Sequence, residues 1–346
     1  MNRVNSFDFI RIVSCLGVFF FHIDQAILQN GLSISVPHMP AWTGFLFVTC
    51  FFMLSGCLME YQYGIHSEED HWNLTDYFRR RFRSVYPSFL TAFLCLYLLI
   101  AIRRSSLFYL GTRWTLLLSF AGLDGYFSSA FQTYYLVGEW FLGGMILLYL
   151  IYPVIRCLLR HRYSTWIYVS ALLLVFYLTA DFNLLAVSPL ANIFSCMISF
   201  TAGIFFERFV RRESGKVQGY VLLINALILL AFTVLKGKTD ISESVPLHLA
   251  GFLLFQCLYQ FGTFIRDGKG RWKITAAYTY EFYIVHHVIL DKLLRMSAGY
   301  GNGKFRGVYI FFYAAVSFVL SGLAAALLHA VAGKITCFFR NAVISS

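Results

Sequence analysis

Residues 7–28 read FDFIRIVSCLGVFFFHIDQAIL, a mostly apolar run that is interrupted by Asp8, Arg11, His22 and Asp24. A helix needs about 20 such residues to cross a hydrocarbon layer roughly 30 Å thick, because it rises about 1.5 Å per residue. Apolar and polar residues do not alternate here as they do in the strands of an outer-membrane barrel. The run therefore predicts a transmembrane helix, and we expect it to be the first anchor and not a cleaved signal peptide.

The remainder of the 346-residue chain repeats this pattern. Hydrophobic residues make up 59% of the chain and charged residues 13%, whereas a soluble domain carries about 25% charged residues. We expect an all-α fold, a polytopic membrane helix bundle of about ten transmembrane helices that forms a single domain over residues 1–346. The predicted spans are 7–28, 41–60, 84–102, 139–157, 164–181, 188–206, 219–235, 246–265, 274–294 and 307–335.

The formal net charge of +11 does not indicate nucleic-acid binding, because Lys and Arg lie in short loops between apolar runs. With the N-terminus inside, the inner loops carry about twice as many Lys and Arg residues as the outer loops. We therefore expect both termini to be cytoplasmic, in a multi-pass protein of a bacterial inner (plasma) membrane. The eight cysteines show no CxxC spacing, and no His/Cys set has zinc-binding spacing. We expect no bound metal and no permanently bound cofactor.

Arg11 and His22 are predicted to share one face of the first helix. They are eleven residues apart, so they differ by only about 20° around the axis and by about 16 Å along it. Taken singly, Arg11 is also compatible with a snorkelling side chain paired with Asp8, and His22 with an interior histidine bonded to a carbonyl. Two ionisable groups on one stripe at membrane depth favour a functional site.

The pattern Asp8-x-x-Arg11-x10-His22 resembles the opening signature of the acyltransferase-3 family of integral-membrane acyltransferases. Four further blocks are similar to that family and occur in the family's order: Phe51-Phe52-Met53-Leu54-Ser55-Gly56, the arginine cluster before Tyr86-Pro87, Trp140-Phe141-Leu142 with Tyr149 and Pro153, and Tyr283-Ile284-Val285-His286. The Trp-Phe-Leu block is similar to the branch that modifies polysaccharides.

The resemblance implies transfer of an acyl group, commonly acetyl, from cytoplasmic acyl-CoA to a hydroxyl of a cell-surface glycan or its lipid-linked precursor. The family's histidine corresponds to His22 and its arginine to Arg11. A neutral imidazole can accept the proton of a hydroxyl as it attacks, and a guanidinium offers forked donors to the phosphates of CoA. An acyl-histidine intermediate is the alternative mechanism.

Secondary candidates follow from the same blocks. Arg81, Arg83 and Tyr86 are candidates for acyl-CoA binding, and the alternative for the arginines is a positive-inside anchor. Glu139 and Trp140 are candidates for the acceptor side, and the alternative for Trp140 is the interfacial aromatic belt.

Two more expectations concern side-chain direction and helix packing. His286 holds the family position, and His287 lies about 100° away from it on the same helix, so we expect only one of them to face a given site. Ser55-Gly56 predicts close helix packing.

Two other functions remain open from the sequence. A polysaccharide exporter or flippase would line a pathway with these polar residues, and a non-catalytic partner of a glycan-synthesis complex would need His22 only for folding. The expected partners are acyl-CoA, a glycan or lipid-linked saccharide acceptor and membrane lipid, with no nucleic acid. The sequence specifies no oligomeric state.

Overall fold

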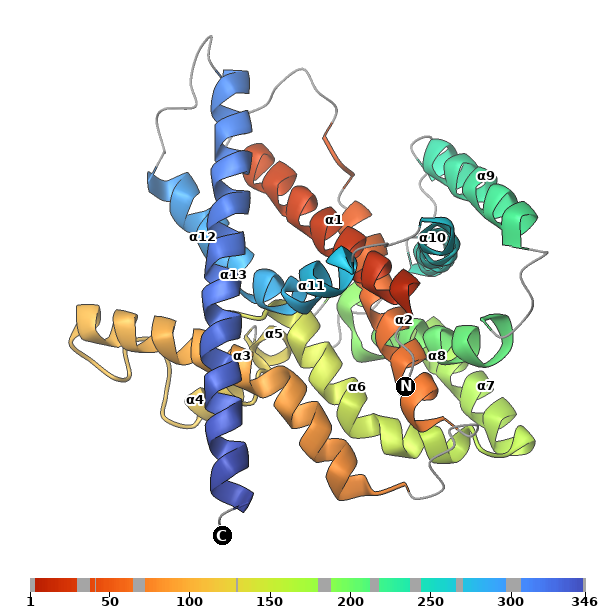
Figure 1. Ribbon diagram of the computed structural model, residues 1–346, viewed down its shortest axis with the longest axis horizontal. Helices are drawn as coiled ribbons and strands as arrows, with labels where there is room; N and C mark the ends of the chain where they lie inside the picture. Colours follow the sequence, from red (N-terminus) through yellow and green to blue (C-terminus); the bar gives the residue numbers. More distant parts are fainter. Residues whose placement is uncertain are drawn as a thin grey trace. The chain divides into compact units, whose positions relative to one another are not determined.

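The computed structural model is helical in all the regular structure that it describes (Figure 1). The structure describes residues 4–29, 38–40, 42–64, 72–128, 130–179, 188–211, 218–236, 244–265, 270–296 and 306–344. The helices are α1 (Asn5–Gln29), α2 (Thr43–Tyr63), α3 (Leu74–Arg104), α4 (Thr115–Phe120), α5 (Asp124–Phe127), α6 (Glu139–Leu158), α7 (Arg162–Thr179), η1 (Pro189–Ala191), α8 (Ile193–Phe205), η2 (Phe206–Val210), α9 (Gln218–Lys236), α10 (Ser244–Phe264), α11 (Arg271–Ala277), α12 (Thr279–Met296) and α13 (Arg306–Ile344).

The prediction of an all-α, multi-pass membrane protein is confirmed. Within the described residues, seven helices are long and apolar enough to cross a membrane: α1, α2, α3, α6, α8 with η2, α10 and α13. The predicted spans 164–181, 219–235 and 274–294 coincide largely with α7, α9 and α12, which are helical but are not among those seven. The total of ten spans and the cytoplasmic termini therefore stay predictions.

Several boundaries differ from those predicted. Helix α3 begins at Leu74, ten residues before the predicted start at 84, and it continues through Pro87. The predicted span 84–102 already contains Pro87, and the prediction places the preceding arginines in the cytoplasmic loop because positive charge marks the inner side of a membrane helix. The predicted span 274–294 is divided into α11 and α12, which are separated by a turn at Tyr278.

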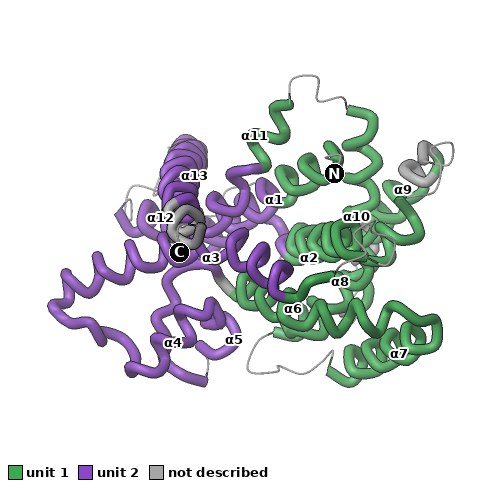
Figure 2. Tube along the Cα trace, turned by 60° about the horizontal axis from the view of Figure 1, so that its bottom comes forward, with its two compact units in different colours: residues 1–14, 45–74, 140–276 green, residues 15–44, 75–139, 277–346 purple. Residues whose placement is uncertain are grey.

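The chain forms two compact units, each assembled from separate stretches of sequence (Figure 2). Unit 1 comprises Met1–Ser14, Phe45–Leu74 and Trp140–Ala276, and unit 2 comprises Cys15–Gly44, Thr75–Glu139 and Ala277–Ser346. The boundary at Ser14 falls inside α1, so this one helix contributes to both units. The expectation of one domain over residues 1–346 stays a prediction.

Unit 1 is built around a contact between α2 and α8 that only glycine permits. A Cβ atom on Gly56 would lie 1.9 Å from the carbonyl oxygen of Phe200, and one on Gly203 would lie 1.9 Å from that of Met53. Small residues of this kind let helix backbones approach closely in membrane proteins. The predicted role of Ser55-Gly56 in close packing is therefore confirmed at Gly56.

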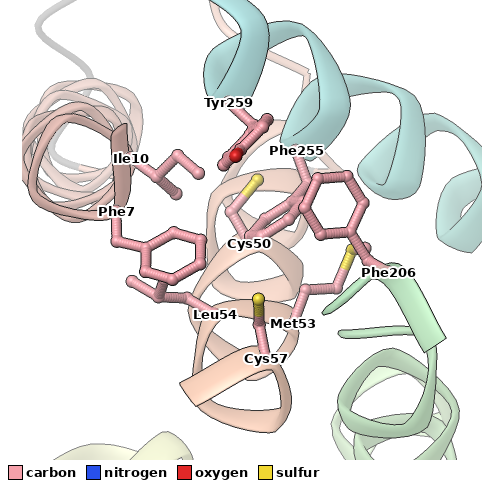
Figure 3. Packing of buried hydrophobic residues seen from close by; sticks show 9 residues of the cluster. All are labelled: Phe7, Ile10, Cys50, Met53, Leu54, Cys57, Phe206, Phe255 and Tyr259. Carbon is pink, nitrogen blue, oxygen red and sulfur yellow. The ribbon is translucent and has the colours of Figure 1, made fainter. Parts of the chain in front are cut away.

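A buried cluster in unit 1 joins α1, α2, η2 and α10 (Figure 3). Its members are Phe7, Ile10, Cys50, Met53, Leu54, Cys57, Phe206, Phe255 and Tyr259. Phe206 contributes edge-to-face contacts, with ring centroids 5.0 Å from both Phe255 and Tyr259. The buried cysteines pack as small hydrophobes, and all eight cysteines of the chain are free.

A buried ion pair connects α2 and η2 in unit 1. Arg208 Nε and Nη2 donate to Glu60 Oε1 and Oε2 at 2.9 and 3.0 Å, and Nη1 donates to the Leu159 carbonyl at 3.0 Å. The arginine and glutamate side chains are only 8% and 4% exposed. Both carboxylate oxygens accept a hydrogen bond from the guanidinium, and these two bonds offset the desolvation cost of burying the charges.

In unit 2, the connection between α3 and α6 is held by its own polar contacts. Ser119 Oγ donates to Asp124 Oδ1 at 2.8 Å and accepts from the Tyr134 backbone N–H at 3.1 Å. The Tyr134 hydroxyl donates to the Gly111 carbonyl at 2.9 Å. The predicted apolar piece at 112–123 contains α4, whose six residues are too few to span a bilayer.

Candidate functional site

The part of α1 that belongs to unit 2 runs in the same direction as α12 and brings His22 to the level of His286 and His287. The Cys15 thiol contacts the Thr279 carbonyl at 3.6 Å, and the rings of Phe19 and Phe282 lie 5.3 Å apart edge to face. The contacting residues advance together along α1 and α12, so the two helices run parallel. Two turns beyond Cys15, α1 presents His22 to the C-terminal half of α12.

His22, His286 and His287 form one cluster. The ring centroid of His22 lies 3.9 Å from that of His287 and 5.4 Å from that of His286, and the two α12 rings are 4.9 Å apart. One nitrogen from each ring can be chosen so that all three lie within 4.8 Å of one another. The expectation that only one α12 histidine faces a given site is wrong, because His22 is within reach of both.

Contacts with backbone and aromatic rings orient His286. Its Nδ1 lies 2.7 Å from the Tyr283 carbonyl, which is an acceptor only, so Nδ1 carries the proton and donates it. Nε2 is then the lone-pair nitrogen of the neutral ring. The ring is 1% exposed, is stacked parallel to Phe282 at 6.2 Å and meets the edge of Phe19 at the same distance. The cluster therefore has an apolar wall on the His286 side.

Asp24, two residues beyond His22, is occupied by the chain that follows α1. Its Oδ1 lies 3.0 Å from His38 Nδ1, and its Oδ2 accepts the Met39 backbone N–H at 2.9 Å. These contacts secure the segment 38–40 against the end of α1. The Asp24 carboxylate thus has a structural role two residues beyond His22.

A second polar group in unit 2 lies toward the N-terminal end of α12. Glu281 Oε1 accepts a hydrogen bond from Ser88 Oγ at 2.8 Å and lies 3.1 Å from His329 Nδ1. The Tyr313 hydroxyl donates to the Leu290 carbonyl at 3.1 Å, so α13 runs antiparallel to α12 along this contact. The carboxylate therefore ties together α3, α12 and α13. Sequence reasoning missed it, although an acid inside an apolar run is itself a signal.

The candidates on α3 differ in their surroundings. Arg81 is half-buried and Arg83 is exposed. The Tyr86 hydroxyl donates to the Ala121 carbonyl at 3.1 Å, and its ring stacks on Phe82 at 4.6 Å. Tyr86 thus anchors the connection that contains α4, and acyl-CoA binding by these three residues stays a prediction.

Two further candidates, Asp8 and Arg11, lie in unit 1, on the N-terminal part of α1. Arg11 Nη1 lies 3.9 Å from Asp8 Oδ1, and the two side chains are 31% and 6% exposed. The pairing of these residues across one turn of the helix, which the sequence left open as the alternative to a functional role for Arg11, is present in the structure. A partner so close in sequence holds the guanidinium against its own helix.

The structure gives few contacts for the acceptor-side candidates, Glu139 and Trp140. Trp140 is half-buried in unit 1, with its ring 6.1 Å from that of Phe52. It therefore packs within the protein. The side chain of Glu139 lies outside the described residues. Their role at the acceptor side stays a prediction.

Comparison with known families settles what kind of protein contains this cluster. A family model described as an acyltransferase domain matches residues 4–331. The chain belongs to the acyltransferase-3 family. No curated protein and no solved structure shows a significant match to it. This acyltransferase-3 protein is thus a multi-pass membrane acyltransferase in general terms, and the match includes all three clustered histidines.

Proposed function

We propose that this protein is an O-acyltransferase of a bacterial inner membrane. It takes an acyl group, most commonly acetyl, from cytoplasmic acyl-CoA and transfers it to a hydroxyl of a cell-surface glycan or its lipid-linked precursor. The family match supports acyl transfer, and the apolar helices support a membrane location. CoA is a substrate here and not a resident cofactor.

The observation that carries the proposal is the contact between His22 and His287, with ring centroids 3.9 Å apart. A hydroxyl becomes an effective nucleophile only when a base takes its proton. A neutral imidazole, with an ordinary pKa of about 6.5, is suited to this at physiological pH. A second ring against the first restricts its rotation, which helps to hold the base in one geometry.

In the proposed reaction, the acceptor oxygen attacks the thioester carbon while His22 takes the hydroxyl proton. The new C–O bond forms and the C–S bond breaks. The CoA thiolate leaves and receives the proton from the imidazolium, so the histidine returns to its neutral form. The step needs no other reactant.

Positive charge on α1 in unit 1 and on α3 in unit 2 supports binding of an anionic donor such as acyl-CoA. Arg11 is permanently charged, and with Arg81 and Arg83 it offers guanidinium donors suited to the phosphates of CoA. Asp8 would support Arg11, and Tyr86 would support the arginines on α3. Glu139 and Trp140 at the start of α6, together with His286, are the proposed acceptor-side residues.

The experiment is a labelled-acetyl transfer assay in membranes that contain wild type, His22→Ala or Arg11→Ala at matched protein levels. We expect label on glycan with wild type, none above background with His22→Ala, and with Arg11→Ala a raised KM for acetyl-CoA. Equal label in all three samples with less polymer at the surface would overturn the proposal in favour of export.

A further inference from the structure

We propose that His22, His286 and His287 bind a divalent transition-metal ion of the Zn²⁺ type. The sequence did not indicate this site, because one histidine comes from α1 and the other two are adjacent on α12. Adjacent helical residues point about 100° apart, and they converge here only because His22 lies between their two directions. The site therefore exists only in the folded unit 2.

The spacing of the nitrogens fits a metal with a small adjustment. One nitrogen from each ring lies within 4.8 Å of the other two. Zn–N bonds of about 2.0–2.1 Å in a tetrahedral site place the nitrogens about 3.3 Å apart. Rotation of the half-buried His22 and His287 side chains about their side-chain bonds can bring the nitrogens to this distance.

The type of ligand selects the type of metal. Imidazole nitrogen suits Zn²⁺, Ni²⁺ and Cu²⁺, whereas Mg²⁺ and Ca²⁺ require oxygen ligands, and this set of side chains contains none. Three neutral imidazoles leave one tetrahedral position open for water or another ligand.

The surroundings of His286 are those of a metal ligand. Its Nδ1 donates to the Tyr283 carbonyl at 2.7 Å, and this bond fixes the tautomer that presents the Nε2 lone pair. Metal-ligating histidines commonly donate their other ring N–H in this way. Phe19 and Phe282 pack against the ring and keep water from that side.

Metal binding and base catalysis exclude each other, because the metal occupies the lone pair with which His22 accepts a proton. Zn²⁺ should therefore inhibit acyl transfer reversibly, and a chelator should restore it. This consequence rests on the proposed function, whereas metal binding itself does not.

The test is calorimetric titration of Zn²⁺ into the purified full-length chain in detergent, with an affinity tag that contains no histidine. Wild type should bind one Zn²⁺ per chain in the presence of millimolar Mg²⁺. His286→Ala and His287→Ala should each weaken binding by about 100-fold or more, since even loss of a residue that supports a ligand costs about 10–100-fold. His38→Gln removes a histidine outside the cluster and should bind Zn²⁺ as wild type does.

Two results would overturn the metal site, and a third would support it while refuting the proposed function. Unchanged Zn²⁺ affinity in a His286→Ala/His287→Ala double variant that elutes as a single folded species would overturn it. Displacement of Zn²⁺ by equimolar Mg²⁺ would overturn it as well. One-to-one binding that depends on the histidines, in a protein with no acyl transfer, would support the metal site and refute the proposed function. His287→Phe, which keeps an aromatic ring in place, serves as the variant that tests ligand loss if His287→Ala does not fold.

Discussion

His22 on α1 and His287 on α12 meet edge to face, with ring centroids 3.9 Å apart. Neither helix makes this site alone, and the parallel course of the two helices sets its register through the Cys15–Thr279 and Phe19–Phe282 contacts. The proposed base is thus positioned by a neighbouring helix as well as by its own.

The ring of His287 should position His22. His287→Ala removes that support, and we expect kcat to fall by about 10- to 100-fold, because a displacement of about 1 Å can cost about 100-fold. His287→Phe replaces the ring but not the nitrogens, and it should recover most of the lost rate. The measurement is kcat and KM for labelled-acetyl transfer. A Phe variant as slow as the Ala variant would assign the effect to a ring nitrogen.

The α2–α8 contact should not tolerate a methyl group. Gly56→Ala would place Cβ 1.9 Å from the Phe200 carbonyl oxygen, a backbone atom that moves only if the helices separate. We expect a destabilisation of at least about 1–3 kcal/mol, seen as a loss of monodisperse protein after detergent extraction. Gly322→Ala is the matched control, because nothing lies within 4 Å of its Cβ position. Equal recovery of both variants would contradict the close contact.

The Glu60–Arg208 pair should be more sensitive to loss of one partner than to loss of both. Arg208→Ala leaves a buried carboxylate uncompensated and should destabilise the protein by about 3–5 kcal/mol. The double variant Glu60→Leu/Arg208→Met should lose less, and Arg295→Ala at an exposed pair should lose at most about 1 kcal/mol. Denaturant titration in detergent checks this order. A double variant less stable than Arg208→Ala would show that the charges themselves are needed.

The Asp124 carboxyl gives the connection before α6 a pH dependence. Burial raises its pKa above the ordinary value, against the opposing effect of the Ser119 hydrogen bond. A group with a raised folded-state pKa contributes stability at pH values below its unfolded pKa, and this contribution is lost as the pH rises through the folded-state pKa. Asp124→Asn keeps an acceptor for the Ser119 hydroxyl and cannot ionise, so it should not lose stability as the pH rises. Thermal unfolding should show the variant matching wild type near pH 4 and exceeding it at pH 8. A variant less stable than wild type at pH 8 would mean that the ionised form is the favoured one.

Local sequence patterns were sufficient for the helical class, the family and the small-residue contact at Gly56. These features depend on runs of apolar residues or on motifs within one segment. The Asp8–Arg11 pair was likewise predictable, because both residues lie within one turn of α1.

The histidine cluster and the Glu281 tie were not predictable in this way, because each needs the register between helices that are far apart in sequence. Helix α12 shows why such sites are hard to predict from sequence. It carries four charged residues within its 18 residues, Glu281, Asp291, Lys292 and Arg295, which is more than a transmembrane helix usually contains. These charged residues make the helix less apolar, so composition alone does not identify it as a membrane span.

Chemical rescue of His22→Gly by imidazole tests whether His22 is the base that takes the hydroxyl proton. His22→Gly should reduce labelled-acetyl transfer to glycan by at least about 100-fold, the lower range for loss of a general base. Added imidazole should restore part of the rate in His22→Gly and leave wild type and Arg11→Ala unchanged. Transfer by His22→Gly at the wild-type rate, at matched protein level and without imidazole, would contradict the assignment of His22 as the base.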